Sequence, residues 1–417
     1  MTPTPIADHE KKIIWLLALL QFVNILDFMM VMPLGPDFAR SLGIAASRIG
    51  DIGGSYTAAA AASGIAGFFF LDRFDRRPAL LVCVVGLAIG TWAAALAWNL
   101  ESLIAARIVA GAFGGPATAL SLSVIADIIP RERRGRAMAT LMATFAVASV
   151  LGVPTGLEIA HAFNWQAPFL VVGGLAALTG ILLYTNLPSL RDHLATAAND
   201  PQGATGRPQL HVLLLRPEVL MCCAMAALIM FSMFAIIPSI APFVLLNLDY
   251  PRDKLGILYM VGGVVSFTGM NIAGRLVDKF GTLPIAIFGS SLLLITIYTG
   301  IVHEPSYGPW VLFVGFMGAS SFRTVSYNTL TSQVPSPGER AGFMSILSAT
   351  QHISSATAAI MSARVLSEVD GKIVGMPLLG MWSIALSALV PVLFFAVNRR
   401  VHRNFIARTL EKSPEMQ

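Results

Sequence analysis

The sequence predicts an all-α integral membrane protein with twelve transmembrane helices, arranged as two copies of a six-helix unit. The chain of 417 residues is 55% hydrophobic and only 12% charged, whereas a soluble domain carries about 25% charged residues. Apolar runs near or above the ~20 residues needed to cross a bilayer recur along its whole length. Landmark residues also repeat at a nearly constant distance along the chain.

The apolar runs define twelve spans and one polar connection. Residues 188–216 lose all apolar periodicity and predict a linker. We therefore expect a six-helix bundle over 1–187, the linker at 188–216, a second bundle over 217–398 and a tail at 399–417. The expected spans are 13–35, 47–71, 79–98, 101–129, 136–161, 166–187, 217–246, 255–277, 283–302, 309–332, 341–366 and 372–397.

The two halves match each other at fixed landmarks. Pro33 and Pro238 are 205 positions apart, and Asp72 and Asp278 are 206 apart. Two further pairs of prolines keep the same offset to within one residue. Such a regular offset indicates a duplicated six-helix unit, which is typical of transporters with repeated halves.

Lysine and arginine are distributed unevenly between the two ends of the spans. Both termini, the linker and the loops 72–78, 130–135, 278–282 and 333–340 fall on one side. Counting Arg136 and Arg275 at the adjoining helix ends, this side holds 20 of the 28 Lys and Arg. The positive-inside rule makes this side cytoplasmic. We expect a multi-pass protein of the plasma (bacterial inner) membrane with both termini in the cytoplasm. The basic balance follows from topology, so no nucleic-acid partner is implied.

The remaining sequence signals exclude other classes of protein. Cys83, Cys222 and Cys223 lie inside apolar runs, so no disulfide framework is implied. The chain has no phosphate-binding loop, zinc-ligand spacing or nucleophile elbow. We therefore expect no enzyme activity, no cofactor and no metal. The segment Ile13–Leu34 is interpreted as a first span rather than a cleaved signal.

Three motifs give the chain a resemblance to the major facilitator superfamily. Leu71–Arg77, with the sequence LDRFDRR, is similar to the family's signature between its second and third helices, although Asp75 stands where a Gly is usual. Gly274–Gly281 is a second copy. Arg107–Gly111 resembles the family's fourth-helix arginine motif, and Gly152–Gly156 resembles its fifth-helix antiporter signature. The form L-G-V-P-x-G is similar to the drug–proton antiporter and sugar-efflux permease branch.

The resemblance implies two six-helix bundles around a central cavity and a secondary active transporter working by alternating access. It favours proton-coupled efflux of a small organic molecule, such as a drug, sugar or metabolite. The alternative is an importer or exchanger of organic anions that uses Arg107 and Arg323; a membrane-embedded enzyme or a sensor is a third, less favoured class. The expected partners are the substrate, protons and the lipid bilayer, and we expect a monomer.

Charged residues beside the cytoplasmic ends of the spans are expected to form a gate. The resemblance implies a cluster of Asp72, Arg76 and Asp127 that holds the halves together in one state and separates in the other. Ordinary positive-inside anchoring is the alternative interpretation, and it suffices for Arg77. The residues expected at this cytoplasmic gate are Asp72, Arg73, Arg76, Asp127, Arg134, Asp278 and Lys279.

Two opposite charges lie at matched depth in the first and fourth spans. Asp27 is about seven residues, or ~10 Å, from the outer end of its span, and Arg107 enters from the same side. Either charge alone would cost several kcal/mol in the membrane, so we expect an ion pair. A protonatable carboxylate beside a fixed guanidinium suits proton coupling or substrate binding; a static structural pair is the alternative. Asn24 extends the polar face.

The last candidates are single polar residues within later spans. Arg323 stands alone in the tenth span, where it would bind an anionic group of the substrate or a carboxylate. Glu158 forms an E-x-x-H pair with His161 and would couple protons or form an ion pair rather than bind metal. His352 would titrate or make an interhelical hydrogen bond. In the fifth span the bend-forming motif residues are Gly152, Pro154 and Gly156.

Overall fold

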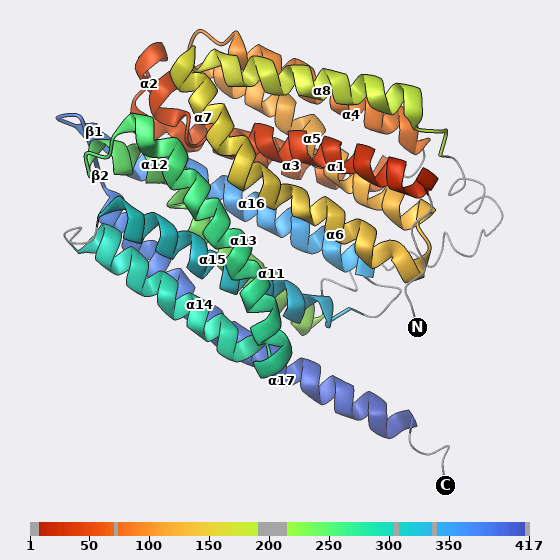
Figure 1. Ribbon diagram of the computed structural model, residues 1–417. Helices are drawn as coiled ribbons and strands as arrows, with labels where there is room; N and C mark the ends of the chain where they lie inside the picture. Colours follow the sequence, from red (N-terminus) through yellow and green to blue (C-terminus); the bar gives the residue numbers. More distant parts are fainter. Residues whose placement is uncertain (1–7, 71–73, 191–214, 304–307, 336–339, 413–417) are drawn as a thin grey trace. The chain divides into compact units, whose positions relative to one another are not determined.

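The computed structural model describes residues 8–70, 74–190, 215–303, 308–335 and 340–412, and within them it is almost entirely helical (Figure 1). The helices of the first half are α1 (Asp8–Met29), α2 (Gly35–Leu42), α3 (Ile49–Phe70), α4 (Arg76–Ala95), α5 (Leu100–Ile128), α6 (Arg131–Val147), α7 (Val153–Ala162) and α8 (Gln166–Asn186). Those of the second half are α11 (Pro217–Phe234), α12 (Ile237–Leu246), α13 (Leu255–Phe280), α14 (Thr282–Ile297), α15 (Pro309–Ser332), α16 (Arg340–Val365) and α17 (Met376–Lys412).

Each of the twelve expected spans falls on one long helix or on two helical segments in succession. Nine stretches of the described residues are long and apolar enough to cross a membrane. The other three spans fall on α3, α15 and α16, which have 22, 24 and 26 residues and are richer in Gly, Ala, Ser and Thr. Small and hydroxyl side chains lower hydropathy, but they allow helices to approach closely.

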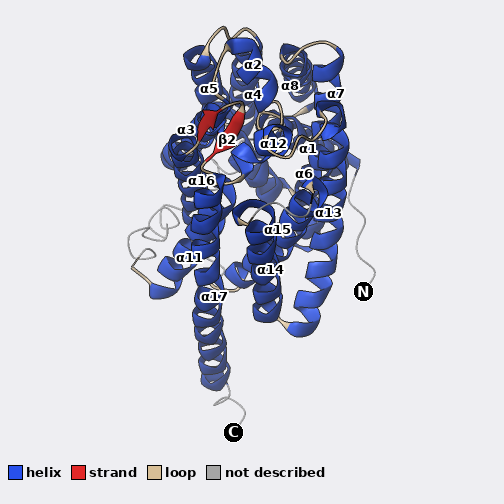
Figure 2. Ribbon diagram, turned by 90° about the vertical axis from the view of Figure 1, so that its left-hand side faces the viewer, coloured by secondary structure: helices blue, strands red, loops and turns tan. Residues whose placement is uncertain are grey.

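Two expected boundaries differ from the structure. The first span was expected to reach residue 35, but α1 ends at Met29, and a turn leads into the separate helix α2. The last span was expected to begin at residue 372, yet Ser367–Val369 (β1) and Lys372–Val374 (β2) form an antiparallel hairpin, shown in red in Figure 2. Positive φ angles at Asp370 and Gly371 close its tight turn, which is the conformation that Asp-Gly favours.

The chain divides into two compact units that do not coincide with its two sequence halves. The first unit comprises 1–206, 237–264 and 355–375, and the second comprises 207–236, 265–354 and 376–417. Helices α13 and α16 therefore contribute one part to each unit. The hairpin and the neighbouring ends of second-half helices belong to the first unit, and this end is called the hairpin end below.

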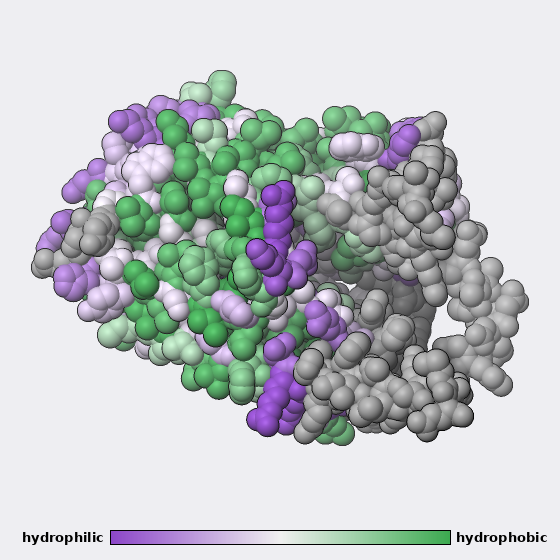
Figure 3. Space-filling view, turned by 60° about the horizontal axis from the view of Figure 1, so that its bottom comes forward, coloured by the Kyte–Doolittle hydropathy of each residue, from purple (hydrophilic) through white to green (hydrophobic). Residues whose placement is uncertain are grey.

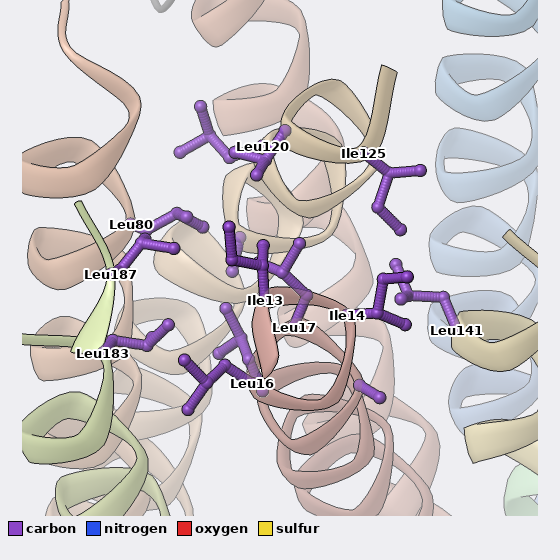
Figure 4. Packing of buried hydrophobic residues seen from close by; sticks show 14 of the residues in the cluster. Ile13, Ile14, Leu16, Leu17, Leu80, Leu120, Ile125, Leu141, Leu183 and Leu187 are labelled. Atoms are coloured by element: carbon purple, nitrogen blue, oxygen red, sulfur yellow. The ribbon is translucent and has the colours of Figure 1, made fainter. Parts of the chain in front are cut away.

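An apolar cluster built mainly on α1 forms the core of one end of the first unit. Figure 4 shows these side chains, which come from α1, α4, α5, α6 and α8. Leu17, Leu80 and Leu183 are fully buried within it. Because lipid is as apolar as these side chains, close van der Waals packing rather than transfer from water holds α1 against its neighbours here.

Glycines let α5 approach α3 and α4 to within backbone contact. A Cβ at Gly111 would lie 2.2 Å from the carbonyl oxygen of Tyr56 on α3. A Cβ at Gly115 would lie 2.7 Å from the carbonyl oxygen of Ala60. On α4, a Cβ at Gly90 would lie 2.5 Å from the amide nitrogen of Ala110. Such close approach by small residues is the usual basis of helix association in membranes.

The second unit has its own core, and large apolar side chains cover much of the outer surface. Tyr327, Phe343 and Phe394 are buried in one cluster from α15, α16 and α17. Outside, Trp98 and Phe163 are 77% and 78% exposed, and hydrophobic residues dominate much of the face seen in Figure 3. A surface this apolar suits a lipid environment.

Replacing Gly111 by Val should lower the free energy of unfolding by about 1–3 kcal/mol, because the added atoms overpack against the backbone of α3. Thermal unfolding of the purified protein would measure the loss. Gly174 on α8 provides the matched control, since a Cβ there has no neighbour within 4 Å. An equal loss in Gly174→Val would contradict the assigned close contact.

Candidate functional site

The carboxylate of Asp27 on α1 and the guanidinium of Arg107 on α5 form a buried bidentate ion pair. Arg107 Nη1 lies 3.0 Å from Asp27 Oδ1, and Nη2 lies 2.8 Å from Oδ2. Nη2 also donates to the backbone carbonyl of Asp27 at 3.2 Å. Both side chains are 0% exposed. Parallel bidentate bonds of this kind combine strength with a fixed geometry.

Two neighbouring side chains complete the surroundings of the pair. The hydroxyl of Thr91 on α4 donates to Asp27 Oδ1 at 2.8 Å. The Arg107 guanidinium carbon lies 4.7 Å from the ring centroid of Tyr56 on α3, a cation–π geometry that favours a desolvated cation. The site therefore draws on four helices of the first unit.

Asn24, one turn before Asp27, extends this polar network along α1. Its Oδ1 accepts from the Tyr56 hydroxyl at 2.9 Å. Its Nδ2 donates to the carbonyl of Gly114 at 3.0 Å and to the hydroxyl of Thr118 at 2.9 Å. A Cβ at Gly114 would lie 2.3 Å from the Tyr56 hydroxyl, so only glycine leaves room for this network.

The sequence analysis did not identify Tyr56 or Thr91. Tyr56 precedes an alanine run, and Thr91 is almost the only polar residue in its span. A polar residue inside a membrane span is a signal of function or of a buried partner. The sequence therefore marked Tyr56 and Thr91 as candidates, although it does not identify the residues that they contact.

The antiporter-like motif coincides with a change in helix type. Residues Ala148–Gly152 form a π-helical turn (η3), where the Val153 amide donates to the carbonyl of Ala148. Pro154 follows at once and lacks an amide hydrogen, which disturbs the regular ladder. A Cβ at Gly152 would lie 2.8 Å from Leu26 on α1, whereas Gly156 has open space. Gly152 thus brings the bend against the helix that carries Asp27.

At the other end of the first unit, Arg76 and Asp127 lie together as expected for a gate. Arg76 Nε is 3.2 Å from Asp127 Oδ2, and the Arg76 side chain is 6% exposed. Asp75 is not part of this ion pair; it caps the N-terminus of α4 by accepting a hydrogen bond from the Arg77 amide at 3.0 Å. Asp75 also accepts bonds from the Ser189 hydroxyl and the Leu190 amide. The unusual Asp thus ties the start of α4 to the chain after α8.

The other expected gate residues are not brought together by the described structure. Asp72 and Arg73 lie outside the described residues. Arg134 lies on α6, but its side chain is not among those described. Asp278 and Lys279 are exposed at the end of α13; Lys279 Nζ lies 5.1 Å from the ring of Phe280, and Asp278 makes no ion pair within the described residues.

Arg323 on α15 is fully buried in the second unit and meets hydroxyl groups rather than a carboxylate. Nη1 donates to Ser387 Oγ on α17 at 3.3 Å, and Nη2 donates to Ser232 Oγ on α11 at 3.2 Å. No carboxylate among the described residues pairs with Arg323, and the expected contact with an anionic substrate stays a prediction.

Glu158 forms no ion pair with, and His352 makes no hydrogen bond to, any other described residue. Glu158 and His161 are both exposed on α7, and neither forms an ion pair with another described residue, so the expected ion pair is absent from this part of the chain. His352 on α16 is half-buried and makes no hydrogen bond to any described residue, contrary to the interhelical bond expected.

A second cluster, which the sequence analysis missed, closes the hairpin end of the first unit. Arg252 pairs with Asp37 on α2, with Nε 2.8 Å from Oδ1. Glu368 of β1 accepts from the Ala46 amide at 3.1 Å. Asn247, just after α12, bonds both the carbonyl and the amide of Ile373 in β2. These contacts join segments more than 100 residues apart.

Close packing reinforces this closure. A Cβ at Gly50 on α3 would lie 2.2 Å from the carbonyl oxygen of Ala359 on α16. A Cβ at Gly54, one turn later, would lie 2.7 Å from Ile360. The Asp-Gly turn was the available signal for the hairpin, and the glycines of α3 could have indicated a contact surface.

Long apolar helices with a buried ion pair among them are typical of polytopic membrane transporters. The Major Facilitator Superfamily model matches residues 17–359. The chain belongs to this family, and its expected membership and fold class are thereby confirmed.

Three known proteins illustrate the similarity. A chloramphenicol resistance protein of Streptomyces lividans is 29% identical over 64% of this chain and 66% of that protein. A probable sugar efflux transporter of Helicobacter pylori (strain ATCC 700392 / 26695) is 24% identical over 58% of this chain and 60% of that protein. The chain thus spans less than two thirds of both relatives. The crystal structure of a D-xylose–proton symporter has a TM-score of 0.73 at 19% identity, covering 92% of this chain and 97% of that chain.

Removing one charge of the Asp27–Arg107 pair should lower the free energy of unfolding strongly. Removing both charges should lower it far less. Arg107→Met leaves a buried carboxylate and should lower the free energy of unfolding by about 3–5 kcal/mol. Asp27→Leu should cost a similar amount for the same reason. The double variant, with no charge left to bury, should recover much of the loss. Apparent unfolding free energies in a double-mutant cycle would test this; additive losses would refute the pair.

Proposed function

We propose that the protein exports small neutral or cationic organic molecules in exchange for protons, with Asp27 as the proton-binding residue. The observation that carries this proposal is the buried pair of Asp27 and Arg107. Among the described residues, one guanidinium and one hydroxyl hold the Asp27 carboxylate, which gives it two alternative states. It is either ionised and paired, or protonated and released from Arg107.

The two states give a physical basis for coupling. Protonation of Asp27 removes the counter-charge of Arg107, and an unpaired guanidinium is expensive in a low-dielectric site. Water or a polar group of the substrate must then solvate it, which requires the site to open. A proton and a substrate thereby compete for the same pair, which is the requirement for exchange.

The substrate class is inferred from the site and from the relatives. The described part of the site offers one carboxylate, one guanidinium, amide and hydroxyl groups, and the aromatic faces of Tyr56 and Phe28. The names of the relatives refer to chloramphenicol resistance and sugar efflux. Both names favour a small polar organic molecule that leaves the cell.

We place the gates at the two ends of the first unit. The hairpin-end cluster of Asp37, Arg252 and Glu368 would face outward, and Arg76 with Asp127 would belong to the cytoplasmic gate together with Asp72, Arg73 and Arg134. In this orientation both termini and the linker lie in the cytoplasm, as the positive-inside rule favours. The bundles 1–187 and 217–398 would rock about the cavity, and the working unit would be the monomer in the plasma membrane.

A liposome assay tests the coupling proposal. Purified protein would be reconstituted with a pH-sensitive dye inside, and cationic, neutral and anionic solutes would be added in turn. A neutral or cationic substrate should move protons in the wild type, and Asp27→Asn should reduce this flux to the level of empty liposomes. Glu101→Gln, which removes an exposed carboxylate from the helix that carries Arg107, should leave it unchanged.

Exchange of organic anions is the competing function. Uptake of an anion without proton movement, insensitive to Asp27→Asn, would establish it and overturn the proposed coupling. In that case Asp27 would remain a structural partner of Arg107.

The hairpin-end ion pair should control how often that end opens. In a variant without the native cysteines, Ser362→Cys places a thiol in the buried layer beside Gly50. Arg252→Gln should raise its labelling rate by a membrane-impermeant maleimide about two- to fivefold, since a partly exposed pair contributes ~0.5–1 kcal/mol. Asp37→Asn should give the same increase.

The double variant Asp37→Asn/Arg252→Gln should label no faster than either single variant, because both break one interaction. Arg48→Gln, which breaks only a local pair with Asp51, is the control and should have no effect. Multiplying effects of the two substitutions would show that the residues do not act as a pair.

A further inference from the structure

Arg323 is a buried cation that forms no ion pair with any carboxylate among the described residues. Its side chain is 0% exposed, and its two hydrogen bonds go to the serine hydroxyls of Ser387 and Ser232. Its Nε makes no hydrogen bond to any described residue. Since a guanidinium stays protonated in proteins, this side chain brings one full positive charge into the interior of the second unit.

The second half of the chain offers no carboxylate at that depth. From Val219 to Val397, the six expected spans of this half contain no Asp or Glu. Glu218 lies at the start of α11 and faces Arg400 at 4.0 Å. Asp278 is exposed at the end of α13. A buried charge costs several kcal/mol unless it is paired, so Arg323 requires an anion from elsewhere.

The internal repeat shows where a carboxylate would have been. Ser232 lies 205 positions after Asp27, the same offset that relates Pro33 to Pro238. In the first unit the residue at this position is an anion bonded to an arginine. In the second unit the equivalent residue also accepts from an arginine, but it is a neutral hydroxyl.

Hydrogen-bond donors around Arg323 are available for an anion. The Ser232 hydroxyl is committed, since it donates to the Ile229 carbonyl at 3.0 Å. The Ser387 hydroxyl accepts from Arg323 and donates to no described group. Ser326, one helical turn after Arg323, is fully buried, and its Oγ has no partner among the described residues. The Arg323 Nε–H and these two hydroxyls are three free donors.

We propose that Arg323, Ser326 and Ser387 bind a small monovalent anion, such as chloride, which acts as the counter-ion of Arg323. One negative charge balances the guanidinium, and a halide accepts bonds from all directions. The complete burial of Arg323 excludes a bulky ion. Arg323 bonds to α11 and to α17, the last helix of the chain, so the site is distinct from the Asp27–Arg107 pair and serves the stability of the second unit.

Binding of radioactive chloride to the purified full chain, in nanodiscs kept in sodium gluconate, tests the proposal. The wild type should bind chloride saturably with one ion per chain, and Arg323→Gln should bind none. Arg364→Gln, which removes an exposed arginine from α16, is the matched control and should bind as the wild type does. Absence of saturable binding to the wild type, or its persistence in Arg323→Gln, overturns the proposal.

Ser232→Asp provides a second test that does not depend on losing the arginine. An aspartate at this position would supply the counter-charge from within the chain, as Asp27 does in the first unit. Chloride should raise the thermal unfolding midpoint of the wild type above its value in gluconate at equal ionic strength, but should leave that of Ser232→Asp unchanged. A chloride-dependent midpoint in Ser232→Asp equal to that of the wild type would count against the site.

Two further measurements distinguish a resident counter-ion from an anionic substrate bound at Arg323. Ser387→Ala should weaken chloride binding severalfold while the protein remains folded, because one donor is lost. Displacement of chloride by a transported organic anion would instead identify a substrate subsite and overturn the counter-ion role. Asp27→Asn should bind chloride normally, so the proposal stands or falls separately from proton coupling.

Discussion

The ion pair between Asp27 and Arg107 is fully buried and constrains the architecture of the first unit. Two charges in a low-dielectric interior must face each other closely, because a desolvated charge left unpaired is costly. Bidentate geometry, the Thr91 hydroxyl and the Tyr56 ring provide that match. Residues of four helices therefore meet at one interaction, and we expect a change in its charge state to act on all four.

Glycine makes this convergence sterically possible. Gly111 allows the backbones of α3 and α5 to touch at Tyr56, and Gly114 leaves space for the Tyr56 hydroxyl and Asn24. The arginine motif thus combines a cation with the small residues that let its neighbours approach. At the antiporter motif, Gly152 lies at a π-helical turn and likewise allows α1 to pack closely against it. Charge and close packing are encoded together in both motifs.

The helices and the Asp27–Arg107 pair were predictable because hydrophobicity and depth are properties of the sequence alone. The partners of the pair were not, since Thr91 and Tyr56 reach it only through the rotation of α4 and α3, which tertiary packing sets. Asp75 departed from the family pattern, and its contacts with the Arg77 amide, the Ser189 hydroxyl and the Leu190 amide, which the structure reveals, explain the change. The hairpin carried an Asp-Gly signal, but three-residue strands are too short for periodicity to indicate.

The two halves illustrate how duplication can preserve geometry while charge diverges. Pro33 and Pro238 keep their places, yet Asp27 corresponds to Ser232 and Arg107 to Leu312 at the same offset. The second half has instead acquired Arg323, where the first half carries Thr118, an acceptor for Asn24. The first unit is internally neutral at its centre, whereas the second contains an excess cation among hydroxyls. Because the bilayer penalises that charge in every conformation, its compensation must move with the second unit, which a small bound anion satisfies and a distant carboxylate does not.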